Sequence, residues 1–193
     1  MGRLPVAALH RLVVAARVDE SRGALVAEAD PAGAVTDVGT AVFGSAGGSG
    51  ETYLAAALTL AGCPSWATEH RRPTGPGAVI VTLRSTAAHL AATQRLLRRW
   101  KDDPPVVGQF LLGVAVLADA PVRPGRDIAA TIDAVAAVVP AVWHIGYQAA
   151  WREHLPGDLD LDKAAAAQLA PITSAINSAA IAAASDEKEN EQS

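Results

Sequence analysis

The chain has 193 residues, of which 50% are hydrophobic, and this is enough apolar material for one sizeable core and a single domain. The formal net charge of -4 gives no electrostatic basis for direct nucleic-acid binding, so we expect any nucleic-acid partner to be contacted indirectly. The single cysteine, Cys63, excludes an intrachain disulfide and a cysteine-based zinc site, which agrees with a reducing cytoplasm.

The first 38 residues predict a packed amphipathic helix followed by an irregular segment rich in Gly, Asp and Ala. Leu9, Leu12, Val13 and Ala16 recur at helical spacing, which is typical of a helix face that packs on a core. Charged residues interrupt this apolar stretch, and no run in the chain reaches the roughly 20 apolar residues that span a bilayer. We therefore expect a cytoplasmic protein without membrane contact.

Between residues 39 and 155, apolar strands alternate with helices. This rhythm predicts an α/β fold with a compact, doubly wound, mostly parallel sheet. Ligands bind such folds at the carboxyl ends of the strands, so we expect the loop after Phe43, the pair Arg84-Ser85 and Asp119 to meet at one edge. The predicted strands are Thr40 to Phe43, Ala78 to Leu83, Phe110 to Leu117 and Val142 to Ile145, and the predicted helices are Glu51 to Leu60, Thr86 to Lys101 and Arg126 to Val139.

Residues 156–184 predict two C-terminal alanine-rich helices, Leu161 to Leu169 and Ile172 to Ala184, separated at Pro171. Their small side chains bury little area, so we expect them to pack against a protein partner or a second copy of the chain. The acidic segment Ser185 to Ser193 predicts a disordered, solvated tail.

The glycine-rich stretch Gly44 to Thr52 lies between the first strand and the first helix of this α/β region. Phosphate binding at such a place requires inward-pointing backbone N–H groups and the positive end of a helix dipole. Glycines permit the unusual backbone angles and the close approach to a ligand. The predicted ligand-binding residues are Gly44, Ser45, Gly47, Gly48, Ser49, Gly50, Glu51, Thr52 and Asp119, with ATP or ADP and Mg²⁺ as cofactors and the Thr52 hydroxyl as a metal ligand.

The strict phosphate-loop pattern G-x-x-x-x-G-K-[ST] fails at two positions, where Ser45 replaces its first glycine and Glu51 its lysine. The run Ala46 to Thr52 instead resembles the deviant loop K-G-G-x-G-K-[ST] of the ParA/MinD-type ATPases, with both lysine positions changed, to Ala46 and Glu51. In that family the second lysine holds the phosphates and the first acts across a nucleotide-sandwich dimer. The resemblance therefore implies a reduced P-loop fold without ATP hydrolysis or an ATP-driven dimer, and a carboxylate at position 51 would repel phosphate.

The resemblance extends weakly from Val42 to Trp151. Val79 to Leu83 resembles the family strand that follows the catalytic aspartate segment, and Leu111 to Asp119 resembles the later strand whose end meets the base. The intervening segment is too short for the family's two aspartate motifs. The glycine loop, the Gly-Cys-Pro-Ser-Trp turn, the Val-Leu-Ala-Asp-Ala-Pro strand end and the Pro-Ala-Val-Trp-x-Ile run are similar to an actinobacterial family of ParA-like proteins with degenerate phosphate loops. The actinobacterial family brings no known activity, and the resemblance to ParA/MinD ATPases implies a nucleotide-binding pseudo-ATPase that acts through protein partners, with a partition or mobile-element system by family association.

Three other interpretations of the same residues stay open. Gly44-x-x-x-Gly48-x-Gly50, with Glu69 about 20 residues further on, also fits a dinucleotide-binding loop and hence NAD(P), although the catalytic Tyr-x-x-x-Lys of short-chain dehydrogenases is absent. The glycines could instead form a flexible turn in a structural adaptor that binds no nucleotide. Asp119 could contact a base or a metal, or cap the turn that follows it.

Overall fold

The computed structural model describes residues 39–68, 77–102 and 109–191 of the chain. The N-terminal helix, the Arg71 to Pro76 turn and Glu69, all singled out in the sequence, lie outside these residues.

The centre of the fold is a five-stranded sheet in which every strand pair is parallel. Its order is β2-β1-β3-β4-β5, which confirms the predicted doubly wound α/β class. Apolar and β-branched residues fill both faces of the central strands, as expected for a sheet covered by helices on each side. The strands are β1 (Thr40–Gly44), β2 (Ser65–Thr68), β3 (Gly77–Arg84), β4 (Gln109–Leu117) and β5 (Val142–Ile145).

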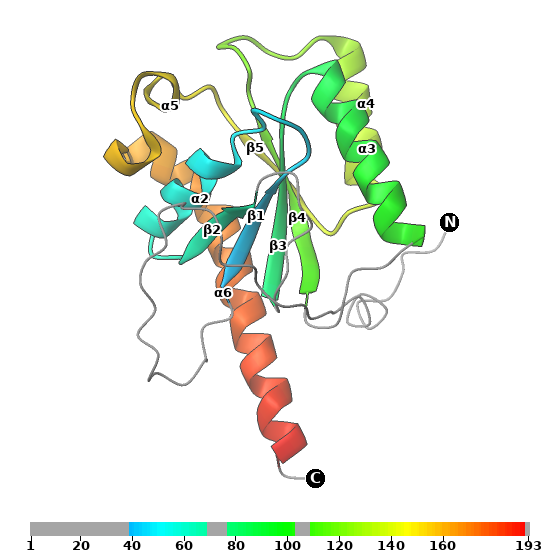
Figure 1. Ribbon diagram of the computed structural model, residues 1–193, viewed down its shortest axis with the longest axis vertical. Helices are drawn as coiled ribbons and strands as arrows, with labels where there is room; N and C mark the ends of the chain where they lie inside the picture. The colour runs from blue at the N-terminus through cyan, green and yellow to red at the C-terminus, as the bar shows by residue number, and fades with distance from the viewer. Residues whose placement is uncertain (1–38, 69–76, 103–108, 192–193) are drawn as a thin grey trace, which may run out of the picture.

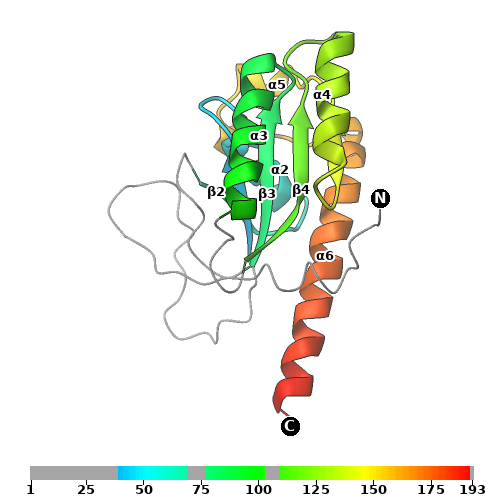
Figure 2. The same ribbon diagram turned by 90° about the vertical axis from the view of Figure 1, so that its right-hand side faces the viewer.

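Helices form one layer on each face of this sheet (Figures 1 and 2). On one face, α2 (Glu51–Leu60) and α6 (Lys163–Glu191) share a core with Val42, Ile80 and Ala115 of the strands. On the other face, α3 (Ala87–Asp102) and α4 (Arg126–Ala136) cover the opposite side chains of the same strands. A short helix α5 (Ala150–Glu153) and a 3₁₀ turn η1 (Pro156–Asp158) connect β5 to α6.

The chain reverses its direction of winding between β1 and β3. From β1 it passes through α2 to β2 on one side of the sheet, whereas from β3 it passes through α3 to β4 and then to β5 on the other side. The loops that leave β1 and β3 consequently turn to opposite faces at the carboxyl ends of the strands, which is the place where doubly wound sheets bind ligands. This edge is where the sequence predicted that a ligand would bind.

Strand β2 was not predicted. It has only four residues, is partly exposed and pairs with β1 alone, at the edge of the sheet. A run this short carries little periodicity, so its strand conformation depends on the backbone pairing from Thr40↔Ser65 to Phe43↔Thr68.

The prediction of two separate C-terminal helices was wrong, because α6 continues through Pro171 as one helix. Proline in a helix interior costs about 3 kcal/mol, since it removes a hydrogen bond and crowds the preceding turn. Leu169, Ile172 and Ile176 lie on one face around it and are buried in the sheet core. Burying each such side chain contributes about 1.5–3 kcal/mol, which together exceeds the cost of the proline.

Helix α6 also continues to Glu191, into the segment for which the sequence predicted disorder. Adding a residue to an existing helix avoids the cost of nucleation, and the Glu and Lys residues of this segment favour helix. Its C-terminal part extends beyond the sheet in both views (Figures 1 and 2). None of the described helices, α6 included, combines the length and apolarity needed to cross a membrane.

Because α6 contributes to the core, we expect Leu169→Ala to lower the free energy of unfolding by about 2–5 kcal/mol. The matched control is Leu155→Ala, because that leucine is 70% exposed against 1% for Leu169. The control should change stability by no more than about 0.5 kcal/mol. Urea denaturation measures both variants, and equal effects would show that α6 is not part of the core.

Candidate functional site

The glycine loop connects the end of β1 to the start of α2 at the carboxyl edge of the sheet (Figure 1). Gly48 and Gly50 have φ angles of 75° and 89°, in the left-handed region that favours glycine. Lack of space also requires glycine at position 50, because a Cβ there would lie 2.5 Å from Cδ2 of Leu117. It is also the N-cap of α2 and offers no side-chain hydrogen bond, so the first N–H groups of the helix are without a side-chain cap.

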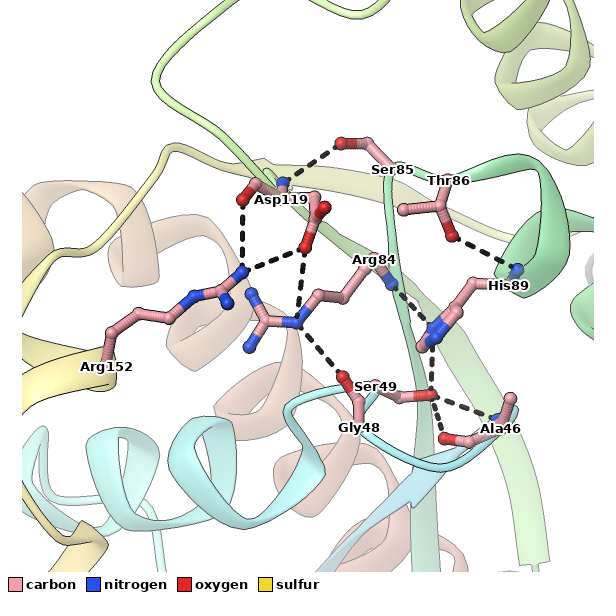
Figure 3. Close-up of polar contacts among 9 residues, drawn as sticks. All are labelled: Ala46, Gly48, Ser49, Arg84, Ser85, Thr86, His89, Asp119 and Arg152. Atoms are coloured by element: carbon pink, nitrogen blue, oxygen red, sulfur yellow. Dashed lines mark hydrogen bonds and ion pairs between the residues drawn. The ribbon is translucent and has the colours of Figure 1, made fainter.

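Ser49 holds the loop in shape from within. Its hydroxyl donates to the carbonyl oxygen of Ala46 and accepts from the Ala46 N–H at 3.0 Å (Figure 3). The residue is fully buried, with an exposed fraction of 0%. Ser49 is therefore a structural residue of the turn, and its proton is committed to the backbone.

Glu51 bridges the two ends of the loop. The residue is 5% exposed, and its carboxylate lies so close to Gly44 that a Cβ on Gly44 would stand 2.6 Å from its Cδ. Neither Oε2 of Glu51 nor the buried Oγ of Ser45 has a hydrogen-bond partner among the described residues. The position at which a phosphate loop carries its lysine thus holds a buried carboxylate folded back onto the end of β1.

Arg84 links the loop after β1 to the residues that follow β4. It is the last residue of β3, and its Nε donates to the carbonyl oxygen of Gly48 at 3.0 Å (Figure 3). The same Nε lies 3.9 Å from Oδ1 of Asp119, which follows β4. The expected meeting of the glycine loop, Arg84-Ser85 and Asp119 at one edge is therefore confirmed, with the Ser85 hydroxyl accepting the Asp119 N–H at 3.2 Å.

Asp119 pairs with a second arginine, Arg152 of α5. Nη2 of Arg152 donates to Oδ1 of Asp119 at 2.9 Å and to its carbonyl oxygen at 3.1 Å. The Arg152 guanidinium also lies 6.0 Å from the centre of the Tyr147 ring. Burial lowers the pKa of Arg84 and the positive charge of Arg152 lowers it further, whereas the Asp119 and Glu51 carboxylates act in the opposite direction.

His89, in the first turn of α3, connects the loop to the end of β3. Its Nδ1 accepts the backbone N–H of Arg84 at 3.2 Å and lies 3.4 Å from the Ser49 hydroxyl. Because Nδ1 accepts the Arg84 N–H, the proton of the neutral ring is assigned to Nε2. Burial lowers the pKa of His89, and the Arg84 charge lowers it further against the opposing effect of Asp119 and Glu51.

An open hollow of about 430 Å³ lies on the far side of Asp119, at the ends of β4 and β5. Its floor is apolar, with Val116, Ile132 and Ile145, and Ser85, Arg123, His144 and Tyr147 supply its polar groups. Ala118 and Ala120, the neighbours of Asp119, also line it. Asp119 therefore stands between two residues that line the hollow, while its side chain pairs with Arg84 and Arg152.

The predicted site residues differ in how far they are exposed. Gly47 and Gly48 are exposed at the tip of the loop, whereas Gly44, Ser49, Gly50 and Glu51 are buried beneath it. Thr52 is exposed on the first turn of α2. No group of three or more His, Cys, Asp or Glu side chains that could hold a metal ion occurs among the residues the structure describes.

Sequence reasoning did not select His89 or Arg152 as site residues. His89 lies at the start of the helix after Arg84, a position that proximity to the strand end could have indicated. Arg152 comes from a short helix 33 residues beyond Asp119 and has no local signal of its role.

The chain matches no protein-family model, and no curated protein matches it significantly. The resemblance to ParA/MinD-type ATPases therefore depends on the quoted motifs, and it stays a prediction.

The contact between Glu51 and Gly44 can be tested by a double-mutant cycle. Gly44→Ala places a methyl group against the carboxylate, and we expect it to cost about 1–3 kcal/mol of stability by overpacking. In a Glu51→Ala background the same change should cost less, with a coupling energy of at least about 0.5 kcal/mol in urea denaturation. Additive effects of the two substitutions would contradict the bridging position of Glu51.

The His89 contacts predict a pH dependence of stability. Because the folded state lowers the pKa of His89 below its usual 6.5, the unfolded chain binds the proton more readily, and stability falls as the pH drops below 6.5. His89→Asn keeps an acceptor oxygen near the position of Nδ1 but does not titrate. Urea midpoints between pH 7.5 and 5 should show the wild type losing stability relative to His89→Asn, and parallel curves would refute the prediction.

Proposed function

We propose that the protein is a pseudo-ATPase of P-loop type, which binds a phosphorylated nucleotide without hydrolysing it and acts through protein partners. The observation that carries this proposal is the position of the glycine loop. It joins β1 to the N-terminus of α2 at the carboxyl edge of the sheet, next to the point between β1 and β3 where the winding of the sheet reverses.

Three features support the binding of a phosphorylated ligand. Doubly wound sheets bind ligands in the crevice at such a reversal. The N-terminus of α2 presents backbone N–H groups and the positive end of a helix dipole, which favour an anion. The hollow beside Asp119 has the size of a small-molecule site and is apolar with a few polar groups, as suits the organic part of a ligand.

The absence of hydrolysis is proposed from Ala46 and Glu51. A P-loop enzyme uses its lysine to stabilise the charge on the transferred phosphoryl group. Here Ala46 carries no charge, and Glu51 is a buried carboxylate folded against Gly44. Neither side chain can supply that positive charge. The association with partition or mobile-element systems follows from the family resemblance alone.

A structural adaptor that binds no nucleotide is the second candidate. The position of Glu51 favours it, because a carboxylate that bridges the ends of the loop reduces the attraction of the loop for phosphate. An NAD(P)-binding protein is the third candidate, and the residue that would recognise its ribose, Glu69, lies outside the described part of the chain.

Isothermal titration calorimetry with ATP, ADP, GTP and NAD, each with and without Mg²⁺, separates the three candidates. We expect saturable binding of a nucleoside di- or triphosphate and no release of inorganic phosphate from ATP. Binding of NAD alone would favour the dinucleotide interpretation. Turnover of ATP would overturn the assignment as a pseudo-ATPase.

Glu51→Lys tests whether the loop keeps the geometry of a phosphate site. Replacing the carboxylate by an ammonium changes the charge beside the ligand by two units, so we expect affinity for ATP to rise at least about tenfold. Glu51→Gln, which removes the charge without adding one, is the matched control and should show a smaller gain. If neither the wild type nor Glu51→Lys binds any nucleotide, the adaptor interpretation replaces the proposal.

A further inference from the structure

Two arginines converge on one carboxylate at the carboxyl edge of the sheet. Arg84 comes from the end of β3 and Arg152 from α5, and both approach the same Oδ1 of Asp119, at 3.9 and 2.9 Å (Figure 3). Two positive groups this close together repel each other. One carboxylate oxygen also cannot accept from all the N–H donors of two guanidinium groups, so donors outnumber acceptors around Oδ1.

Most of those donors have no partner among the described residues. Within the described residues, the hydrogen bond and the ion pair of Arg84 both use Nε, and both hydrogen bonds of Arg152 use Nη2. Figure 3 shows no contact drawn to the two terminal nitrogens of Arg84. A guanidinium has five N–H donors in a planar fork, so neither arginine makes the two parallel bonds that it prefers with an oxyanion.

Two of these three side chains are well exposed to a ligand. The side chains of Arg152 and Asp119 are 45% and 44% exposed. The side chain of Arg84 is 16% exposed and donates a hydrogen bond to the loop. Arg84 therefore supplies a fixed positive charge next to Gly48 and Gly50, on the loop that has a carboxylate at its lysine position.

We propose that Arg84 and Arg152 together bind the terminal phosphates of the ligand, in place of the lysine that the loop lacks, and that Asp119 is their counter-ion when no ligand is bound. A phosphate has three terminal oxygens and can accept two parallel bonds from each guanidinium, which a single carboxylate oxygen cannot. The inference depends on the proposed function for the identity of the ligand, but the anion site itself does not require a nucleotide.

Titrations with inorganic pyrophosphate and with ADP test this inference on the full chain. Arg84→Gln and Arg152→Gln should each weaken the binding of both ligands at least about tenfold, the loss expected for a charge-assisted hydrogen bond. Asp119→Asn removes the competing charge and should strengthen binding severalfold. The control is Arg98→Gln, an exposed arginine of α3 about 13 Å along the helix from His89, which should bind like the wild type.

The outcomes distinguish this inference from the proposed function. If the wild type binds ADP and both arginine variants bind it equally well, the arginine pair is not the anion site and the proposed function stands. If pyrophosphate binds with the expected variant pattern but no nucleotide does, the anion site stands and the nucleotide function falls. If neither the wild type nor Asp119→Asn binds either ligand, both the arginine site and the proposed function are overturned. Because Asp119→Asn is expected to gain affinity, it still tests the inference if an arginine variant fails to fold.

Discussion

The reversal of winding between β1 and β3 is the constraint on which the rest of the structure depends. Since α2 and α3 leave these neighbouring strands toward opposite faces, the loop after β1 and the residues after β3 diverge at the carboxyl edge. Residues that follow β1, β3 and β4 can contact one another at this edge, because none of them is needed to fill the core beneath the helices. The same geometry gives each face its own helical layer, so the site lies on a scaffold that is buried on both sides.

The protein itself supplies many of the contacts that hold the glycine loop. Ser49 bonds back to Ala46, Arg84 holds the carbonyl of Gly48, and Glu51 lies against Gly44. A neutral hydroxyl, a positively charged guanidinium and a carboxylate thus fix the conformation of the loop together. Burying a carboxylate oxygen that has no hydrogen-bond partner among the described residues, as Oε2 of Glu51 is buried, costs free energy, and proteins retain such costs more often at functional sites than elsewhere.

The charged side chains at this edge come from elements that are far apart in the sequence. The glycine loop is followed by the buried carboxylate of Glu51, and the positive groups come from the end of β3 and from α5. Asp119 lies between them, and its chain neighbours Ala118 and Ala120 line the hollow at the ends of β4 and β5. One carboxylate therefore pairs with both arginines at this edge.

The sequence by itself determined the alternation of strands and helices, the bounds of α2, and the edge at which Gly44 to Gly50, Arg84 and Asp119 meet, because hydrophobic periodicity and glycine positions are local properties. It did not predict β2, whose four residues depend on pairing with β1, and it ended a helix at Pro171, where burial of Leu169 and Ile172 outweighs the cost of proline. Only the tertiary structure decided that Glu51 folds onto Gly44 and that Arg152 reaches Asp119. These contacts join residues through the packing of separate elements, and no local pattern in the chain specifies which side chains such packing brings together.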